Sequence, residues 1–154
     1  MKREQKSLTN KGFSLVELII VVAIMAVLIG VLAPQYLRYV EKTRLQRDNS
    51  SIAEVANVIK MASAEETVVT QLSSGAVTYT FDATTGMGGV GTTALDEEIK
   101  ATITPADVKI TSNTYATTAP TLTVRVNSSN HQIEVEASDW METPNATSSI
   151  TKKF

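Results

Sequence analysis

The dominant feature of the hydrophobic pattern is an apolar run near the N-terminus. No charged residue occurs from Leu18 to Leu37, and the centre of this stretch reads LIIVVAIMAVLIGVLA. A helix from Phe13 to Ala33 would be about 31 Å long, which matches the roughly 30 Å hydrocarbon core of a bilayer. A helix buried in a soluble domain would show polar residues at a helical period, and this run shows none. The run therefore predicts a transmembrane helix.

The pattern changes at residue 38 from apolar all round to apolar on one side. Residues 38–68 contain neither glycine nor proline. The apolar residues that recur at intervals of seven are Leu45, Ile52 and Ile59. Such spacing gives a helix one apolar face, which can dock on a globular head. We expect a single helix from Phe13 to about Thr70, transmembrane in its first half and amphipathic in its second.

Beyond residue 70 the apolar positions alternate, and threonine, which is β-branched and favours strands, becomes frequent. Strands are predicted at 76–82, 104–112, 122–127 and 132–137, with 104–112 at a sheet edge. A hairpin turn is predicted at 127–130, and a short helix at 95–103. The fold class that follows is α+β, with the long helix packed on a small antiparallel sheet.

The charge of the 154-residue chain is segregated, although the net charge is only −2. Residues 1–12 and residues 38–47 each hold four basic residues and one acidic residue, whereas residues 48–154 hold six basic and thirteen acidic residues. A basic N-terminal tip stays in the cytoplasm, and a long acidic domain can be translocated, so we expect the head outside the membrane. An acidic head also disfavours direct nucleic-acid binding.

Several kinds of chemistry are excluded or disfavoured by composition. With no cysteine and one histidine, His131, the chain offers no disulfide, no thiolate zinc site and no multi-histidine metal site. No Ser/His/Asp arrangement has a spacing that supports catalysis, so we expect neither an enzyme nor a cofactor. The cluster at 38–47 is open to three interpretations: a solvated face, contacts with anionic lipid headgroups, or salt bridges between subunits.

Two sequences resemble binding motifs but lack the expected context. Residues 86–91 fit G-x-G-x-x-G, but no helix opens there and no parallel strand follows, so we expect a flexible surface loop. The acidic run Asp96–Glu98 lacks the alternating ligands of a calcium loop and is better explained by a helix N-terminus. We therefore predict no metal site. A glycosylation-type sequon begins at Asn145, and His131 is expected to be exposed in the hairpin turn.

Glu17 is the anomaly of the apolar segment, because a carboxylate inside a membrane is costly. Two interpretations are open: a glutamate near the interface that reaches water, or an intramembrane carboxylate that awaits a cationic partner. An ordinary secretory signal would be cut after the apolar run, but Pro34, Gln35, Tyr36 and Leu37 follow it there. The unusual local sequence lies before the run, at Lys11–Glu17, and reads KGFSLVE.

The segment KGFSLVELIIVVAIMAVLIGVLAPQY resembles the N-terminus of a type IV prepilin. The resemblance implies that a prepilin peptidase cuts between Gly12 and Phe13 and methylates the new amine of Phe13. Glu17 is the fifth residue of the mature chain, where the family has a glutamate. Pro34 matches the family's helix proline, and with the weak helix former Gly30 it marks a stretch that the resemblance implies can unwind in a filament.

The resemblance implies a pilin fold and four segments. These are a cleaved leader (1–12), a transmembrane and assembly helix (13–37), an amphipathic continuation (38–72) and a threonine-rich β head (73–154). The implied function is a structural subunit that moves from the cytoplasmic membrane into an extracellular pilus used for adhesion or twitching motility. Implied partners are copies of itself, other pilins, the peptidase, the assembly machinery and the membrane.

Two alternatives to this function stay open. A pseudopilin of a type II secretion or DNA-uptake machine shares the same N-terminus. A single-pass membrane-anchored binding domain that never polymerises would leave Gly12, Phe13 and Glu17 unexplained.

Overall fold

Helix α1 (Leu15–Ala62) extends through both structural units of the chain. The computed structural model describes residues 12–127, 129–130, 132–144 and 150–154. The first unit is Met1–Leu37 and the second is Arg38–Phe154. The remaining elements all lie in the second unit, in the order α2 (Glu66–Ser73), β1 (Val77–Asp82), β2 (Gly86–Gly88), α3 (Ala94–Thr102), η1 (Pro105–Asp107), η2 (Asn113–Tyr115), β3 (Thr121–Val126), β4 (Ile133–Trp140) and β5 (Ile150–Lys153).

The strands form one antiparallel sheet in the order β2-β1-β3-β4-β5. Val77 of β1 is opposite Val124 of β3, which in turn is opposite Val135 of β4. Inward and outward residues alternate in β1 and β3, as the sequence pattern predicted. The prediction of an α+β fold, with a long N-terminal helix followed by a small antiparallel sheet, is confirmed.

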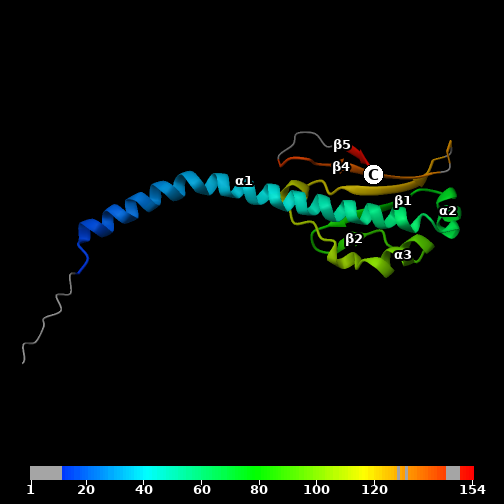
Figure 1. The fold of residues 1–154 in the computed structure, drawn as a ribbon, viewed down its shortest axis with the longest axis horizontal. Coiled ribbons are helices and arrows are strands. Elements are labelled where there is room, and N and C mark those ends of the chain that lie inside the picture. Colours follow the sequence, from blue (N-terminus) through cyan, green and yellow to red (C-terminus); the bar gives the residue numbers. More distant parts are fainter. Residues whose placement is uncertain (1–11, 128, 131, 145–149) are drawn as a thin grey trace, which may run out of the picture. The chain divides into compact units, whose positions relative to one another are not determined.

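The core of the second unit joins residues from α1, α2, α3 and the sheet in a single cluster. The three α1 residues predicted at intervals of seven are buried, with at most 1% of their surface exposed. Facing side chains that are fully buried include Tyr79, Phe81, Leu122 and Val124. Helices α2 and α3 lie beside the C-terminal part of α1 (Figure 1), where Val68, Leu72, Leu95 and Ile99 are buried.

The second edge of the sheet is β5, which the sequence pattern did not predict. It is anchored to β4 by aromatic contacts, since the Phe154 ring packs edge-on against Trp140 with centroids 5.5 Å apart. The Lys152 ammonium lies 4.5 Å from the centroid of the Trp140 ring, a cation–π contact. Trp140 reaches the buried side because the register shifts between Ala137 and Trp140, where Asp139 adopts a positive φ of 56°.

The single helix expected to reach Thr70 is instead interrupted after Ala62. The backbone N–H groups of Ala64 and Glu65 bond to carbonyls three residues earlier, which tightens the last turn. The Ser63 hydroxyl also bonds to the carbonyls of Ile59 and Lys60. No glycine or proline marks this break. The turn is favoured because it allows α2 to bury the apolar side chains of Val68 and Leu72 in the core.

The predicted edge strand at 104–112 is wrong, and so is the predicted glycine loop at 86–91. Residues Gly86–Gly88 pair with β1 as the edge strand, while Pro105 begins the short 3₁₀ helix η1. Gly86 has φ of 83°, and a Cβ there would lie 2.5 Å from the carbonyl oxygen of Pro105. The glycine therefore permits the turn and lets η1 approach the edge of the sheet.

Buried Asp48 ties α1 to the segment between η1 and η2. Its carboxylate accepts hydrogen bonds from the backbone N–H groups of Thr111 and Ser112 at 2.7–3.0 Å, and from the Thr111 hydroxyl at 2.9 Å. Only 2% of the Asp48 surface is exposed. A buried carboxylate is tolerated because each of its oxygens has strong donors, and it fixes this segment on the helix.

Two further α1 side chains repeat this arrangement on either side of Asp48. Glu41 accepts hydrogen bonds from the backbone N–H and the hydroxyl of Thr114, both at 2.9 Å. Asn49 donates to the carbonyl of Met141 at 2.8 Å and accepts from the Tyr115 hydroxyl at 2.6 Å. These polar side chains of α1 thus form hydrogen bonds with two segments that are distant in the sequence, one at Thr114 and Tyr115 and the other at Met141.

Asp96 completes the start of α3, as the interpretation of the acidic run predicted. It accepts from the Thr93 N–H at 3.0 Å, and the Thr93 hydroxyl and the Asp96 backbone complete the capping box. The buried Tyr79 hydroxyl donates to its other oxygen at 2.9 Å. Burial raises the pKa of Asp96, but the hydrogen bonds from Thr93 and Tyr79 outweigh burial and hold that pKa below its ordinary value.

Asp48→Ala is expected to destabilise the folded chain by about 3 kcal/mol, because two backbone donors lose their only charged acceptor. The measurement is urea unfolding of the full chain in detergent micelles. Glu54→Ala is the matched control on the same helix, since Glu54 is exposed, and it should change the free energy of unfolding little. An equal loss in both variants would contradict this role of Asp48.

Asp96→Asn is expected to cost about 2 kcal/mol at pH 7 and to weaken the acid dependence of stability. Because the folded-state pKa of Asp96 is lowered, its contribution is complete above its ordinary pKa of 3.8 and is lost as the pH falls through the folded-state value. Thermal unfolding between pH 7 and pH 2.5 tests this. If the melting temperature of the variant falls below pH 4 as steeply as that of the wild type, Asp96 does not contribute to the acid dependence of stability.

Candidate assembly site

The first unit consists of apolar surface with no cover from the described chain. The large apolar side chains between Leu15 and Leu37 are 48–73% exposed, and Phe13 is 92% exposed. A surface of this kind needs lipid or another protein chain around it. By length and composition, α1 is apolar enough to cross a membrane. The candidate site is therefore this exposed helix and the short segment before it.

Gly12 and Phe13 precede the helix and are exposed. Backbone outside a helix has free amide groups, which a peptidase can bind. A Cβ built on Gly12 would meet no atom within 4 Å, so the fold itself does not require glycine at this position. A requirement for glycine must then come from a partner that binds this backbone closely.

Glu17 has a local hydrogen bond that the sequence analysis did not anticipate. Its carboxylate accepts from the backbone N–H of Ser14 at 2.9 Å, immediately before the first helical residue. Ser14 to Glu17 has the S-x-x-E spacing of a capping box, and this signal could have predicted the contact. The same carboxylate lies in the first turn of α1, where a negative charge also favours the helix dipole.

Gly30 and Pro34 lie inside α1, which continues through both. Pro34 has no N–H, so the carbonyl of Gly30 lacks its usual helical partner. No atom lies within 4 Å of a Cβ built on Gly30, so its small size meets no packing need within this chain. We therefore expect the pair to weaken the helix locally.

Comparison with known proteins concerns this same segment. Residues 8–33 match the family model described as the prokaryotic N-terminal methylation motif. The chain carries a type IV prepilin signal. No curated protein and no solved structure matches the chain.

The prepilin signal supports a type IV pilin-like or pseudopilin protein, which is a structural subunit rather than an enzyme. It implies processing by prepilin peptidase and use of a pilus-type assembly machinery. Together with the apolar helix it fits a membrane-anchored pilin-like protein. The match includes Gly12, Phe13, Glu17 and Gly30 and ends one residue before Pro34.

The head offers no comparable site among its described residues. No three His, Asp or Glu side chains gather there in a way that could hold a metal ion. Gly86 and Gly88 belong to β2 of the β1–β2 hairpin, and α3 begins at Ala94, beyond the last glycine of the motif. His131 and Asn145, considered from the sequence, lie outside the described residues.

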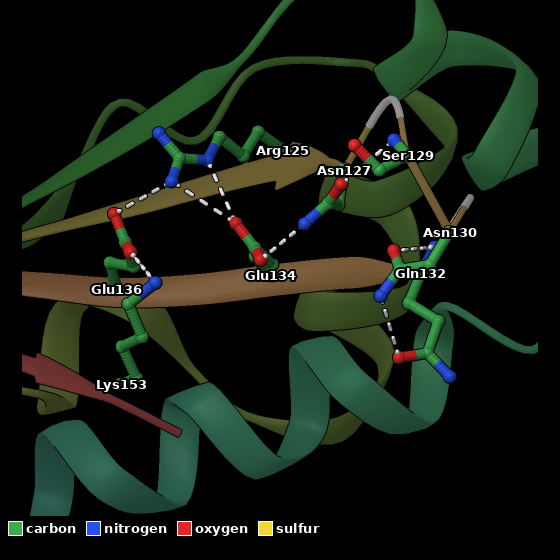
Figure 2. A network of polar contacts seen from close by, with 8 residues as sticks. All are labelled: Arg125, Asn127, Ser129, Asn130, Gln132, Glu134, Glu136 and Lys153. Carbon is green, nitrogen blue, oxygen red and sulfur yellow. Dashed lines mark hydrogen bonds and ion pairs between the residues drawn. The ribbon is translucent and has the colours of Figure 1, made fainter.

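One charged cluster on the sheet neutralises itself. Arg125 forms ion pairs with Glu134 and Glu136 at 3.1 and 3.3 Å, and Lys153 forms one with Glu136 at 2.8 Å (Figure 2). Hydrogen bonds from Asn127 and Arg125 lower the pKa of Glu134, and Glu136 raises the pKa of Lys153. These residues link β3, β4 and β5, and their charges are already paired within the head.

Gly30→Ala is expected to strengthen α1 locally by about 1 kcal/mol, because alanine fits the open space and is the better helix former. Hydrogen exchange of the backbone around residues 28–33, measured by mass spectrometry in detergent micelles, should become slower. Ala26→Gly is the reverse control and should make exchange faster in the same region. Unchanged exchange in Gly30→Ala would show that this stretch is not a weak point.

Proposed function

We propose that this protein is the precursor of a structural subunit of a type IV pilus, which polymerises through residues 13–37 into an extracellular filament for adhesion or motility. The observation that carries the proposal is the prepilin signal on a helix whose apolar side chains have no cover in the described chain. In the membrane, lipid covers this helix with the N-terminus in the cytoplasm. In the filament, neighbouring copies take the place of lipid.

Processing removes the leader and leaves the mature chain with a charged N-terminus. Hydrolysis of the bond between Gly12 and Phe13 gives a carboxylate on Gly12 and an ammonium on Phe13, and the leader of residues 1–12 leaves. Methylation of the Phe13 amine keeps its positive charge. The exposed, non-helical position of both residues supports cleavage at this bond.

Glu17 then sets the register between subunits. The apolar helix surface has few features that distinguish one sliding position from another. A carboxylate inside that surface is costly unless an opposite charge meets it. We propose that the Phe13 ammonium of an incoming subunit pairs with Glu17 of its neighbour. Gly30 and Pro34 mark the stretch where α1 can lose helical hydrogen bonds when the subunits pack.

Mass spectrometry of sheared surface filaments tests processing and function together. We expect abundant filaments made mainly of a chain that begins at N-methylated Phe13. Trace incorporation beside another major subunit would favour a pseudopilin or minor pilin. An uncut chain retained in the membrane would favour a membrane-anchored binding domain and contradict the proposal.

Glu17→Ala and Glu17→Gln should both reduce filament yield at least about tenfold while the protein remains in the membrane. Glutamine can still accept the Ser14 hydrogen bond but carries no charge, so it separates helix capping from ion pairing. Ser14→Ala is the matched control, because it retains the backbone donor and the Glu17 charge, and its yield should be normal. Normal assembly of Glu17→Gln would contradict the ion-pairing role.

A further inference from the structure

The second unit carries cations on α1 that its own head does not neutralise. Arg38, Lys42, Arg44 and Arg47 are exposed, and no ion pair joins any of them to a described residue. This differs from Arg125 and Lys153 on the sheet, whose charges are paired. Lys60, nearer the end of α1, is likewise exposed and has no ion pair to a described residue, so α1 has five cations available to a partner, four of them clustered between residues 38 and 47.

An acidic seam lies between α1 and the segment from α3 to η1. Two hollows of about 240 and 250 Å³ follow one another along it. The first includes Glu54 and Asp107 in its lining, and the second includes Glu65 and Glu98. All four carboxylates are exposed, and none forms an ion pair with a described residue.

The lining of the seam also suits the chemistry of a long cationic side chain. Ile103 and Val108, which are half-buried, contribute apolar surface to the first hollow, and Met61, which is 76% exposed, contributes to the second. Lysine and arginine bury their methylene stems on such surface while the charged end reaches a carboxylate. Each hollow thus combines a place for the stem with an acceptor for the charge.

The seam and two of the cations lie on opposite sides of α1. At 3.6 residues per turn, Ser51, Glu54, Val58 and Met61 share one stripe of the helix. Arg38 and Lys42 lie about 140–180° around the helix from that stripe, whereas Arg44 and Arg47 lie within about 60° of it. A contact that repeats through an open helical polymer needs two different complementary surfaces on each subunit. Arg38 and Lys42 on one side and the seam on the other provide such surfaces.

We propose that Arg38 and Lys42 of one copy of this chain dock into the acidic seam of a neighbouring copy. This inference rests on the proposed function and adds a second contact, outside the apolar helix, that positions the heads. These two parallel copies would be displaced along α1 by about 18 to 28 Å, the rise from Lys42 to Glu54 and to Met61 at ~1.5 Å per residue. They are therefore a different pair from the copies that meet through Phe13 and Glu17, which are displaced by only about 6 Å. Salt should weaken the contact, because all its charges are solvent-exposed before docking.

Charge reversal in the full-length protein, in cells that form wild-type filaments, tests the contact. The cation variant is Arg38→Glu with Lys42→Glu, and the seam variant is Glu54→Lys with Asp107→Lys. Each alone should lower the yield of sheared filaments roughly fivefold or more, and their combination should restore it to within about twofold. The matched control is Arg47→Glu. Because Arg47 lies on the seam side of α1, any loss of filament yield in this variant should not be restored by adding the seam variant.

Three results would overturn the interface. These are normal yield in both single variants, failure of the combination to rescue, and a loss that follows the cation variant alone, which would assign those cations to anionic lipid headgroups. Thermal unfolding of each variant in detergent checks that the head remains folded. If wild-type filaments form but the variants do not behave as expected, only the interface is overturned and the proposed pilin function is unaffected. If the wild-type protein forms no filaments, both the proposed function and the interface are overturned.

A cross-linking experiment keeps the test independent of filament yield. The chain has no cysteine, so Lys42→Cys with Glu54→Cys introduces the only two thiols. Within one chain these positions are about 18 Å apart along α1, too far for a disulfide. Oxidation of filaments, or of membranes in which subunits associate, should give a ladder of covalent multimers. Arg47→Cys with Glu54→Cys is the control pair, and an equal ladder from it would contradict the proposed facing.

Discussion

The structure depends on one constraint: α1 must satisfy two different environments along a single backbone. Its N-terminal part exposes apolar side chains on every side, while its C-terminal part buries Leu45, Ile52 and Ile59 and leaves charged residues outside. The transition falls near the boundary between the two structural units, at Leu37 and Arg38. The C-terminal part can be stabilised by the chain itself, but the N-terminal part cannot. The need of the N-terminal part for lipid or for neighbouring copies follows from that difference.

The head is held to α1 by polar contacts as well as by apolar burial. Asp48, Glu41 and Asn49 bind backbone or side-chain groups of the segments around Thr111, Thr114 and Met141. Such contacts specify position more sharply than apolar packing does, since each donor needs an acceptor in one place. With no cysteine in the chain, these contacts do the positioning that a covalent link could otherwise provide.

Much of the fold could be predicted from hydrophobic periodicity, and the errors have physical causes. The alternating strands β1, β3 and β4 and the capped helix α3 follow local rules that are visible in the sequence. The interruption after Ala62 carries no glycine or proline, because it is imposed by burial of Val68 and Leu72. The choice of Gly86–Gly88 as the edge strand, in place of 104–112, depends on the distant approach of Pro105. Pairing between distant segments leaves little local signal.

The prepilin signal could be recognised from the sequence because its pattern is linear. A glycine, a glutamate and a proline at fixed offsets in an apolar helix can be recognised without a fold. What the sequence analysis missed there was a hydrogen bond, although the Ser14–Glu17 spacing could have indicated it. The acidic seam is a different case. Its carboxylates come from positions as far apart as Glu54 and Asp107, so only the folded head brings them together.

The hydrogen bond from Ser14 to Glu17 has a consequence for reversibility. A glutamate that caps its own helix is not a stranded charge in the unassembled subunit, because it already has a donor inside the same chain. In the proposed filament that neutral donor would be exchanged for the ammonium of a neighbour. Assembly would then replace one hydrogen-bond donor of Glu17 with another partner. A subunit that returned to the membrane would therefore not leave the Glu17 carboxylate without a donor.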